Sequence, residues 1–272
     1  MNGKNNPIEI TDLNAIGPQD QPGEIVVVDH APHVSVLSLC SQNGVKHVIQ
    51  KSNLNSNAEI NLSTLSMTTP THFFDYPLSS IWGQQHPSEE SEKNLCELSF
   101  NVAKWSERDN ILVEFENYVK NLTSSPTLLN DILTVVDEVL SNAIFSAPFK
   151  DQETSISRTA THIPIDPARK PYLFAGHDSE RIVIGCRDSY GNLKISDLIV
   201  RIQKCYENNL GDMINFGEGG AGIGSFLMFH YSVSMYIGVD TGRSTTVCYS
   251  FPLKLSAAKR SQVPKNIHLV QR

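Results

Sequence analysis

Helical periodicity is strongest in the middle of the chain, where two stretches carry apolar side chains every three or four residues. In the first stretch these side chains share one face, at Ile111, Leu112, Phe115, Tyr118, Val119 and Leu122. Ser125 and Pro126 then form a helix start signal, and the same period continues from Leu128 to Ile144, shortly before Pro148. The pattern therefore predicts two consecutive helices, each with one buried face.

Strand-like segments dominate the residues that follow. Four runs rich in β-branched and aromatic side chains are expected to be strands, at 170–176, 180–188, 233–239 and 245–253. A helix over 196–208 is predicted between the second and third of them. Together with the central helices, these strands predict an α+β sandwich, with helices on one face of a mostly antiparallel sheet.

The N-terminal part has a different order of elements. Residues 24–30 and 45–51 are predicted strands joined by a helix over 32–42, an order that is typical of a small parallel sheet. Residues 52–92 are rich in Ser, Thr, Asn and Pro, and we expect a looser connection there. Its aromatic segment at 72–82, HFFDYPLSSIW, is interpreted as a packing patch between domains rather than as a ligand site.

These differences divide the chain into four predicted parts. A flexible leader covers residues 1–22, and a small α/β domain with its connector covers 23–92. The main α+β domain is expected at 93–256, and a C-terminal tail at 257–272. A chain of 272 residues, of which 40% are hydrophobic, can bury one large core and a second, smaller one.

Charge and composition exclude several classes of function. The net charge is −7 and Lys or Arg never occur in more than a pair, so the chain has no basic surface for nucleic acid. No segment approaches the roughly 20 apolar residues of a membrane span, and no secretory signal is found, which predicts a cytoplasmic protein without a membrane partner. The 5 cysteines are scattered, which argues against disulfide bonds and a zinc site.

Two pairs of residues stand out within the predicted elements. Glu138 and Asn142 lie four residues apart on the second central helix, so both project from one face. A carboxylate beside an amide oxygen suits proton transfer and Mg²⁺ binding, although solvent-exposed polar residues have the same spacing. Asp188 ends a predicted strand and Gly191 follows in a turn; this Asp would accept the exocyclic amine of a purine, or simply form the turn.

A glycine-rich run, GEGGAGIGSF at 217–226, precedes an apolar helix-like segment. It is no Walker loop, because no Lys-Ser or Lys-Thr follows the glycines. It has the spacing of a dinucleotide fingerprint, but no strand precedes it and too few residues follow for a doubly wound sheet. The third interpretation is a loop whose N–H groups, with the following helix N-terminus, receive phosphates.

In this order and on these elements, the three motifs resemble the GHKL ATPase superfamily, which includes histidine kinases and anti-sigma-factor serine kinases. The resemblance spans residues 107–254 and implies a GHKL ATP-binding sandwich that binds ATP and Mg²⁺. It implies that Glu138 is the catalytic base and Asn142 the Mg²⁺ ligand. The residues that it places around the nucleotide are Asp188 with Gly191 at the adenine, Gly220, Gly222 and Gly224 at the phosphates after a lid at 207–219, and Thr245 or Thr246 beside the Asp.

The resemblance implies a role in a bacterial regulatory pathway. The leading interpretation is a kinase that phosphorylates Ser or Thr of a protein partner, such as an anti-sigma antagonist or a sigma-like protein. Two alternatives remain: an inactive, ATP-dependent switch that sequesters a partner, and an adaptor without nucleotide. They rest on two departures, because DSYGN lacks the second glycine of the adenine box and Ser146 stands where these kinases often carry His. Homodimerisation is left open.

The N-terminal segment resembles the start of a response-regulator receiver domain, with Asp29 at the end of its first strand. A receiver also carries a phosphoacceptor Asp on a later strand, but no Asp occurs from residue 30 to residue 74. We therefore expect a degenerate receiver-like domain that serves in interactions rather than in phosphorylation.

Overall fold

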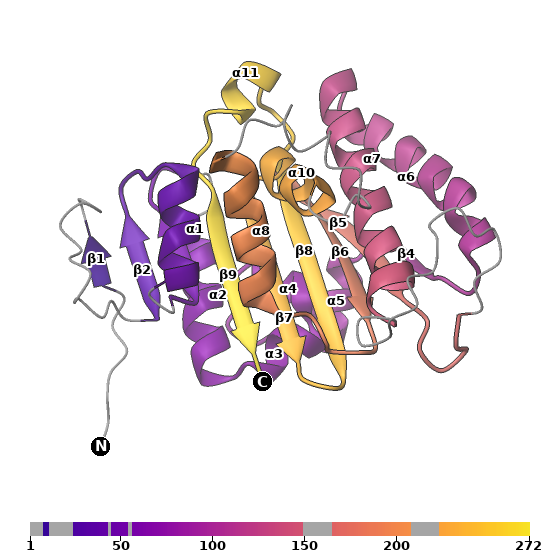
Figure 1. Ribbon diagram of the computed structural model, residues 1–272. Coiled ribbons are helices and arrows are strands. Elements are labelled where there is room, and N and C mark those ends of the chain that lie inside the picture. The colour runs from indigo at the N-terminus through magenta and orange to yellow at the C-terminus, as the bar shows by residue number, and fades with distance from the viewer. Residues whose placement is uncertain (1–7, 11–23, 43–44, 54–55, 149–164, 208–222) are drawn as a thin grey trace.

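The computed structural model describes residues 8–10, 24–42, 45–53, 56–148, 165–207 and 223–272. These residues form one nine-stranded sheet with the order β1-β2-β3-β9-β7-β8-β6-β5-β4 (Figure 1). The strands are β1 (Ile8–Ile10), β2 (Ile25–Val28), β3 (His47–Gln50), β4 (Leu98–Asn101), β5 (Tyr172–His177), β6 (Arg181–Asp188), β7 (Ser234–Asp240), β8 (Ser244–Pro252) and β9 (Asn266–Gln271).

Most neighbouring strands of this sheet are antiparallel. Pairing is antiparallel from β4 through β5, β6 and β8 to β7, and again between β3 and β9. The parallel pairs are β1 with β2, β2 with β3, and β7 with β9. The predicted α+β class with a mostly antiparallel sheet is therefore confirmed, and the two predicted N-terminal strands, β2 and β3, are parallel as expected.

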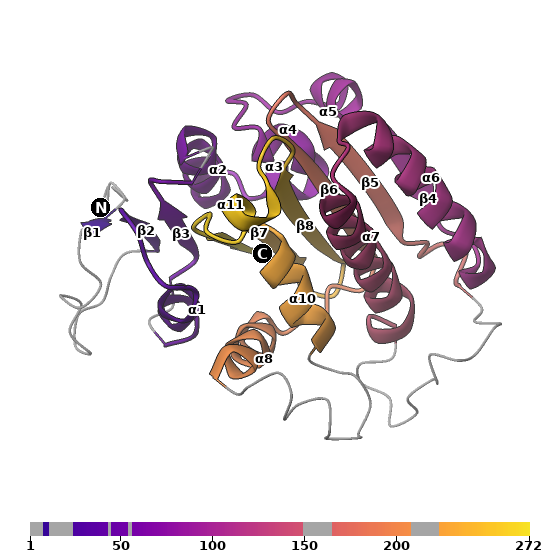
Figure 2. The same cartoon turned by 90° about the horizontal axis from the view of Figure 1, so that it is seen from above.

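Strand side chains alternate between two cores because successive residues point to opposite faces of a sheet. On β5, Leu173 and Ala175 belong to the larger core, whereas Phe174 packs into the smaller one. Figure 2 shows helices on both sides of the sheet, and one of these two layers covers the larger core. The helices of this layer are α1 (His33–Gln42), α6 (Arg108–Leu122), α7 (Pro126–Ser141), α8 (Ile195–Glu207) and α10 (Ile223–Tyr231).

The opposite face of the sheet is covered as well, which differs from the predicted one-sided arrangement. Residues 52–92 were expected to be a looser connection, but their described part is largely helical: α2 (Ser56–Thr68), α3 (Thr71–Asp75), α4 (Pro77–Ile81) and α5 (Glu89–Leu95). The aromatic segment lies within them, and Phe73 and Phe74 pack on the sheet in the smaller core. The segment thus packs on the sheet, because both strand faces of this sheet are apolar and need cover. Its expected place between two domains stays a prediction.

The C-terminal segment also differs from its prediction as a tail. Residues 257–272 contain the short helix α11 (Ala257–Arg260) and strand β9, which lies inside the sheet between β3 and β7. Ile267 and Leu269 face the larger core and Val270 the smaller one. Because β3 pairs with β9, the N-terminal and C-terminal ends of the chain share one sheet.

A buried polar cluster lies under α2, on the smaller-core side. We call it the Glu59 cluster; it consists of Glu59, Arg181, Ser234, Tyr236 and His268, each at most 1% exposed. The Glu59 carboxylate contacts the Tyr236 hydroxyl at 2.7 Å, Nε2 of His268 at 2.7 Å and Arg181 at 3.4 Å. The cluster thus joins α2 to β6, β7 and β9.

Within the described residues, no helix is long and apolar enough to cross a bilayer.

Candidate functional site

Helix α7 carries the first predicted pair. It begins as its sequence predicts, because the Ser125 hydroxyl accepts a hydrogen bond from the N–H of Leu128 at 3.3 Å and Pro126 takes the first helical position. After Ser141 the helix widens into a π-helical turn, η3, over Asn142–Ser146. Such turns often occur at functional sites, and Asn142 is the first residue of this one.

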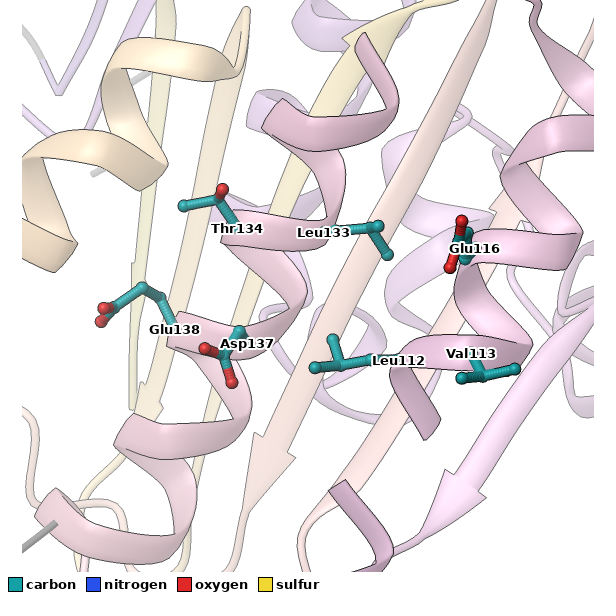
Figure 3. A pocket seen from close by; sticks show the side chains of 7 residues that line it. All are labelled: Leu112, Val113, Glu116, Leu133, Thr134, Asp137 and Glu138. Atoms are coloured by element: carbon teal, nitrogen blue, oxygen red, sulfur yellow. The ribbon is translucent and has the colours of Figure 1, made fainter. Parts of the chain in front are cut away.

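Glu138 lies against the start of α10. A methyl group built on Gly224, the second residue of α10, would lie 2.1 Å from Oε2 of Glu138. Figure 3 shows Glu138 extending from α7 on the side away from α6. The first turn of a helix is electropositive because its N–H groups have no partner within the helix. The end of the glycine run and the carboxylate of the predicted base are therefore in contact.

The neighbouring Asp137 has a different environment. It lines a shallow pocket between α6 and α7 together with Leu112, Val113, Glu116, Leu133, Thr134 and Glu138 (Figure 3). Its carboxylate accepts two hydrogen bonds from Arg108, at 2.6 and 2.7 Å, so it belongs to a bidentate ion pair. Trp105 packs edge-on against Phe145 of the π-helical turn, with ring centroids 4.7 Å apart. These contacts brace the end of α7 from the α6 side.

Asp188 is the last residue of β6 and is only 8% exposed. Its Oδ1 accepts the N–H groups of Tyr190 at 2.9 Å and Gly191 at 3.4 Å, which forms the predicted turn. Burial raises the pKa of this carboxyl above its ordinary value, although these N–H groups and the hydroxyl and N–H of Thr245 act to lower it. No cation pairs with Asp188 among the residues that the structure describes.

Gly191 has a conformational reason to be glycine. Its φ is +61°, and a methyl group there would lie 2.0 Å from the carbonyl oxygen of Asp240. The carbonyl of Gly191 also accepts the N–H of Gly242 at 3.1 Å. This glycine therefore lets the Asp188 turn pack against the turn between β7 and β8.

The two threonines proposed to support Asp188 point to opposite faces of the sheet. Thr245 pairs with Asp188 in the register of β6 and β8, so their side chains share a face. Thr246 pairs with Arg187, and its hydroxyl accepts a hydrogen bond from Nε of Arg187 at 3.3 Å. The structure therefore places Thr245, and not Thr246, beside the buried carboxylate.

One residue that the sequence did not single out links the two halves of the site. The side-chain amide of Asn192 donates a 2.6 Å hydrogen bond to the carbonyl of Ala147, which follows the π-helical turn. The Asp188 turn is thereby tied to the end of α7. The polar character of Asn192 directly after the turn glycine was the available signal.

Several predicted phosphate-loop residues lie outside the described part of the chain. They are Gly220, Gly222 and the lid at 207–219 except Glu207. Within the described residues, no group of three His, Cys, Asp or Glu side chains is arranged to hold a metal ion. The described site thus consists of the end of α7, the Asp188 turn with Thr245, and the first turn of α10.

Comparison with known proteins adds little to this geometry. No protein-family model matches the chain, and no curated protein matches it. A SiaB–SiaC complex from Pseudomonas aeruginosa is similar with a TM-score of 0.41 and 14% identity, over 60% of this chain and 94% of that chain.

Proposed function

We propose that this protein binds ATP with Mg²⁺ at the described site and transfers the γ-phosphoryl group to a Ser or Thr of a regulatory protein partner. The observation that carries the proposal is Asp188, a buried carboxylate at the end of β6 for which the described residues supply no counter-cation. Burial raises the pKa of this carboxyl, and a buried acid with a perturbed pKa is a candidate functional residue. The first turn of α10 and the carboxylate of Glu138 lie in contact in the same site.

Asp188 would hold the adenine. Its Oδ1 already accepts the two turn N–H groups, and a carboxylate has further acceptor capacity for the exocyclic amine of adenine. Thr245 shares its face of the sheet and adds a hydroxyl. The pairing rejects bases that present an acceptor at this position, because two acceptors would then meet in a buried site.

Glu138 and Asn142 would act at the phosphate groups of the bound ATP. Asn142 offers the oxygen donor that Mg²⁺ prefers, and nucleotide phosphates and water complete such sites, so the donor set fits this ion. Mg²⁺, when bound, offsets the negative charge of the phosphates. In the transfer, the serine oxygen bonds to the γ-phosphorus, the bond to the bridging oxygen of ADP breaks, and Glu138 accepts the hydroxyl proton.

A thermal-shift titration tests the nucleotide assignment. ATP with Mg²⁺ at about 100 times its dissociation constant should stabilise the folded protein by about 2.7 kcal/mol, and omission of Mg²⁺ should reduce the effect. NADH should leave the melting temperature unchanged. Stabilisation by NADH and none by ATP would reverse the choice between the two interpretations of the glycine run.

A kinase assay tests the transfer step. Glu138→Gln should lower phosphate transfer from labelled ATP to partner proteins by about 10² to 10⁴, the range for a general base, while ATP affinity changes little. Glu114→Gln is the matched control, because Glu114 is exposed on the neighbouring helix α6. Undiminished transfer by the Glu138 variant would remove Glu138 from catalysis.

A non-catalytic switch is the second candidate, and the position of Glu138 favours it. A carboxylate against the first turn of α10 is also suited to stabilise that helix end, and this role needs no catalysis. In a switch, wild-type protein yields no phosphoprotein, and ATP changes only the affinity for the partner. An adaptor without nucleotide would show neither effect.

A further inference from the structure

Two histidines face each other where the N-terminal strands join the rest of the sheet. His47 on β3 and His268 on β9 are partners in the strand register, and their side chains are 1% and 0% exposed. Their Nδ1 atoms lie 3.1 Å apart, which is a hydrogen-bond distance. One proton therefore lies between the two rings.

The contacts of His268 fix its other nitrogen. Nε2 lies 2.7 Å from Oε2 of Glu59, and the negative charge of this carboxylate favours a proton on that nitrogen. The Ser63 hydroxyl lies 3.2 Å from Nδ1 of His268, but it also donates to the Glu59 carbonyl at 2.9 Å. Nδ1 of His268 is thus left to face Nδ1 of His47, and a second proton between them would set two N–H groups against each other.

The charges around the pair do not stabilise this second proton. From α2, the only carboxylate is Glu59, and Arg181 from β6 already contacts it at 3.4 Å. From β7, the neutral Tyr236 ring stacks on His268 with centroids 5.2 Å apart. Just before β3, Lys46 next to His47 adds a positive charge that pairs with Glu24. A doubly protonated pair would be buried without an available counter-charge.

The pair sits on a narrow junction. The ladder between β3 and β9 has two register pairs, His47 with His268 and Val48 with Ile267. Among the described strands it is the pairing that connects β1, β2 and β3 to the other six. Further hydrogen bonds add to it: from the N–H of Gln50 to Asn266 at 2.8 Å, from Nε2 of Gln50 to the Lys265 carbonyl at 2.9 Å, and from the N–H of Leu269 to the Lys46 carbonyl at 2.8 Å. Helix α1 also packs on α8.

We propose that the His47–His268 pair is an acid-sensitive latch: the junction between β3 and β9 is closed while the pair holds at most one extra proton, and it opens when both rings are charged. Opening frees one edge of β9 and one edge of β3 for other contacts. The latch is independent of the proposed nucleotide site.

The pKa of His47 agrees with this geometry. Burial, the His268 ring and Lys46 hold it well below its ordinary value. In the open junction the ring would titrate near 6.5, so the open form binds the proton that the closed form excludes. Between pH 7.5 and pH 5.5 the opening equilibrium should therefore shift toward the open form at least about tenfold.

Native-state hydrogen exchange of the full chain tests the latch. Exchange rates of the amides that cross the junction, Gln50 and Leu269, divided by their intrinsic rates at each pH, should rise at least about tenfold between pH 7.5 and pH 5.5. The amides of β5 and β6 should not respond. His47→Gln should remove this dependence. His86→Gln, a change of an exposed histidine, should retain it. Wild-type exchange that ignores pH, or a full response in His47→Gln, overturns the proposal.

A second measurement needs no variant, so it tests the proposal even if His47→Gln does not fold. NMR titration of the wild-type ring signals follows protonation of His47 directly. The second proton of the pair should enter over the pH range in which the amides of Gln50 and Leu269 lose their protection. Uptake of both protons with the junction still protected overturns the latch.

Discussion

Glu59 and Asp188 are both buried carboxylates on the same sheet, yet their surroundings are opposite. Glu59 contacts Arg181, His268 and Tyr236. Burial alone would raise the pKa of Glu59, but these partners bring it below its ordinary value. Asp188 accepts the turn N–H groups and lies beside Thr245, and burial raises its pKa.

The difference separates a structural acid from a candidate binding acid. The charge of Glu59 is matched within the protein, so the fold itself uses the carboxylate. Asp188 has hydrogen-bond donors but no cation among the described residues, so burial of its charge is only partly offset. A ligand that donates a hydrogen bond would supply what this second site lacks.

The largest expected effect comes from neutralising the structural acid. Glu59→Gln leaves Arg181 buried with no carboxylate and should lower the free energy of unfolding by about 3 to 5 kcal/mol. Urea denaturation measures this loss. Glu89→Gln is the control, because Glu89 is exposed in its pair with Lys93. Equal stability of the two variants would show that the Glu59 cluster does not hold the layers together.

Neutralising the candidate binding acid should act on the ligand instead. Asp188→Asn keeps an oxygen for the turn N–H groups but presents an NH₂ group to adenine. It should weaken ATP binding by about 1 to 3 kcal/mol and change the free energy of unfolding by less than about 1 kcal/mol. Calorimetry and urea denaturation give the two numbers. A variant that binds ATP normally would leave Asp188 as a turn residue only.

The two acids should also give stability of opposite pH dependence. The pKa of Glu59 is lowered by folding, so its stabilisation is complete above the ordinary pKa of a Glu and is lost as pH falls. The pKa of Asp188 is raised, so the folded state binds the proton first and gains stability as pH falls toward the ordinary value of an Asp.

A comparison of wild type with Asp188→Asn isolates the pH dependence of stability that Asp188 contributes. As pH is lowered from 7 to 4, stability should shift in favour of wild type, by at most about 1.4 kcal/mol per pH unit. Urea denaturation at several pH values measures this slope. A constant difference between the two proteins would mean that burial does not perturb Asp188.

The smallest effect distinguishes the two threonines. Thr245→Val removes the hydroxyl beside Asp188 and should weaken ATP binding by about 0.5 to 1.5 kcal/mol. Thr246→Val, one residue further along β8, faces Arg187 and should leave ATP affinity unchanged. Isothermal calorimetry of the two variants with ATP measures both affinities. Equal losses in both variants would contradict the assignment of faces.

Local patterns predicted the parts of the fold that depend on neighbouring residues. The period of α7 and its Ser125–Pro126 start gave the helix that carries Glu138, and the strand ending at Asp188 was also predicted. Hydrophobic periodicity reports which side chains of one element are buried, so it succeeds for elements that bury one clear face. It failed for α2 to α5, where polar side chains at buried positions hide the period: Glu59, Ser63 and Ser79 are all 0% exposed.

By itself, then, the sequence determined the central helices, most strands and the spacing of Glu138 and Asn142, because these follow from contacts within a few residues. Only the tertiary structure decided that β9 enters the sheet beside β3, that Thr245 rather than Thr246 faces Asp188, and that Arg181 meets Glu59. Strand order and register join distant segments, and a shift of one residue turns every side chain to the other face. Such pairings depend on how the whole core packs.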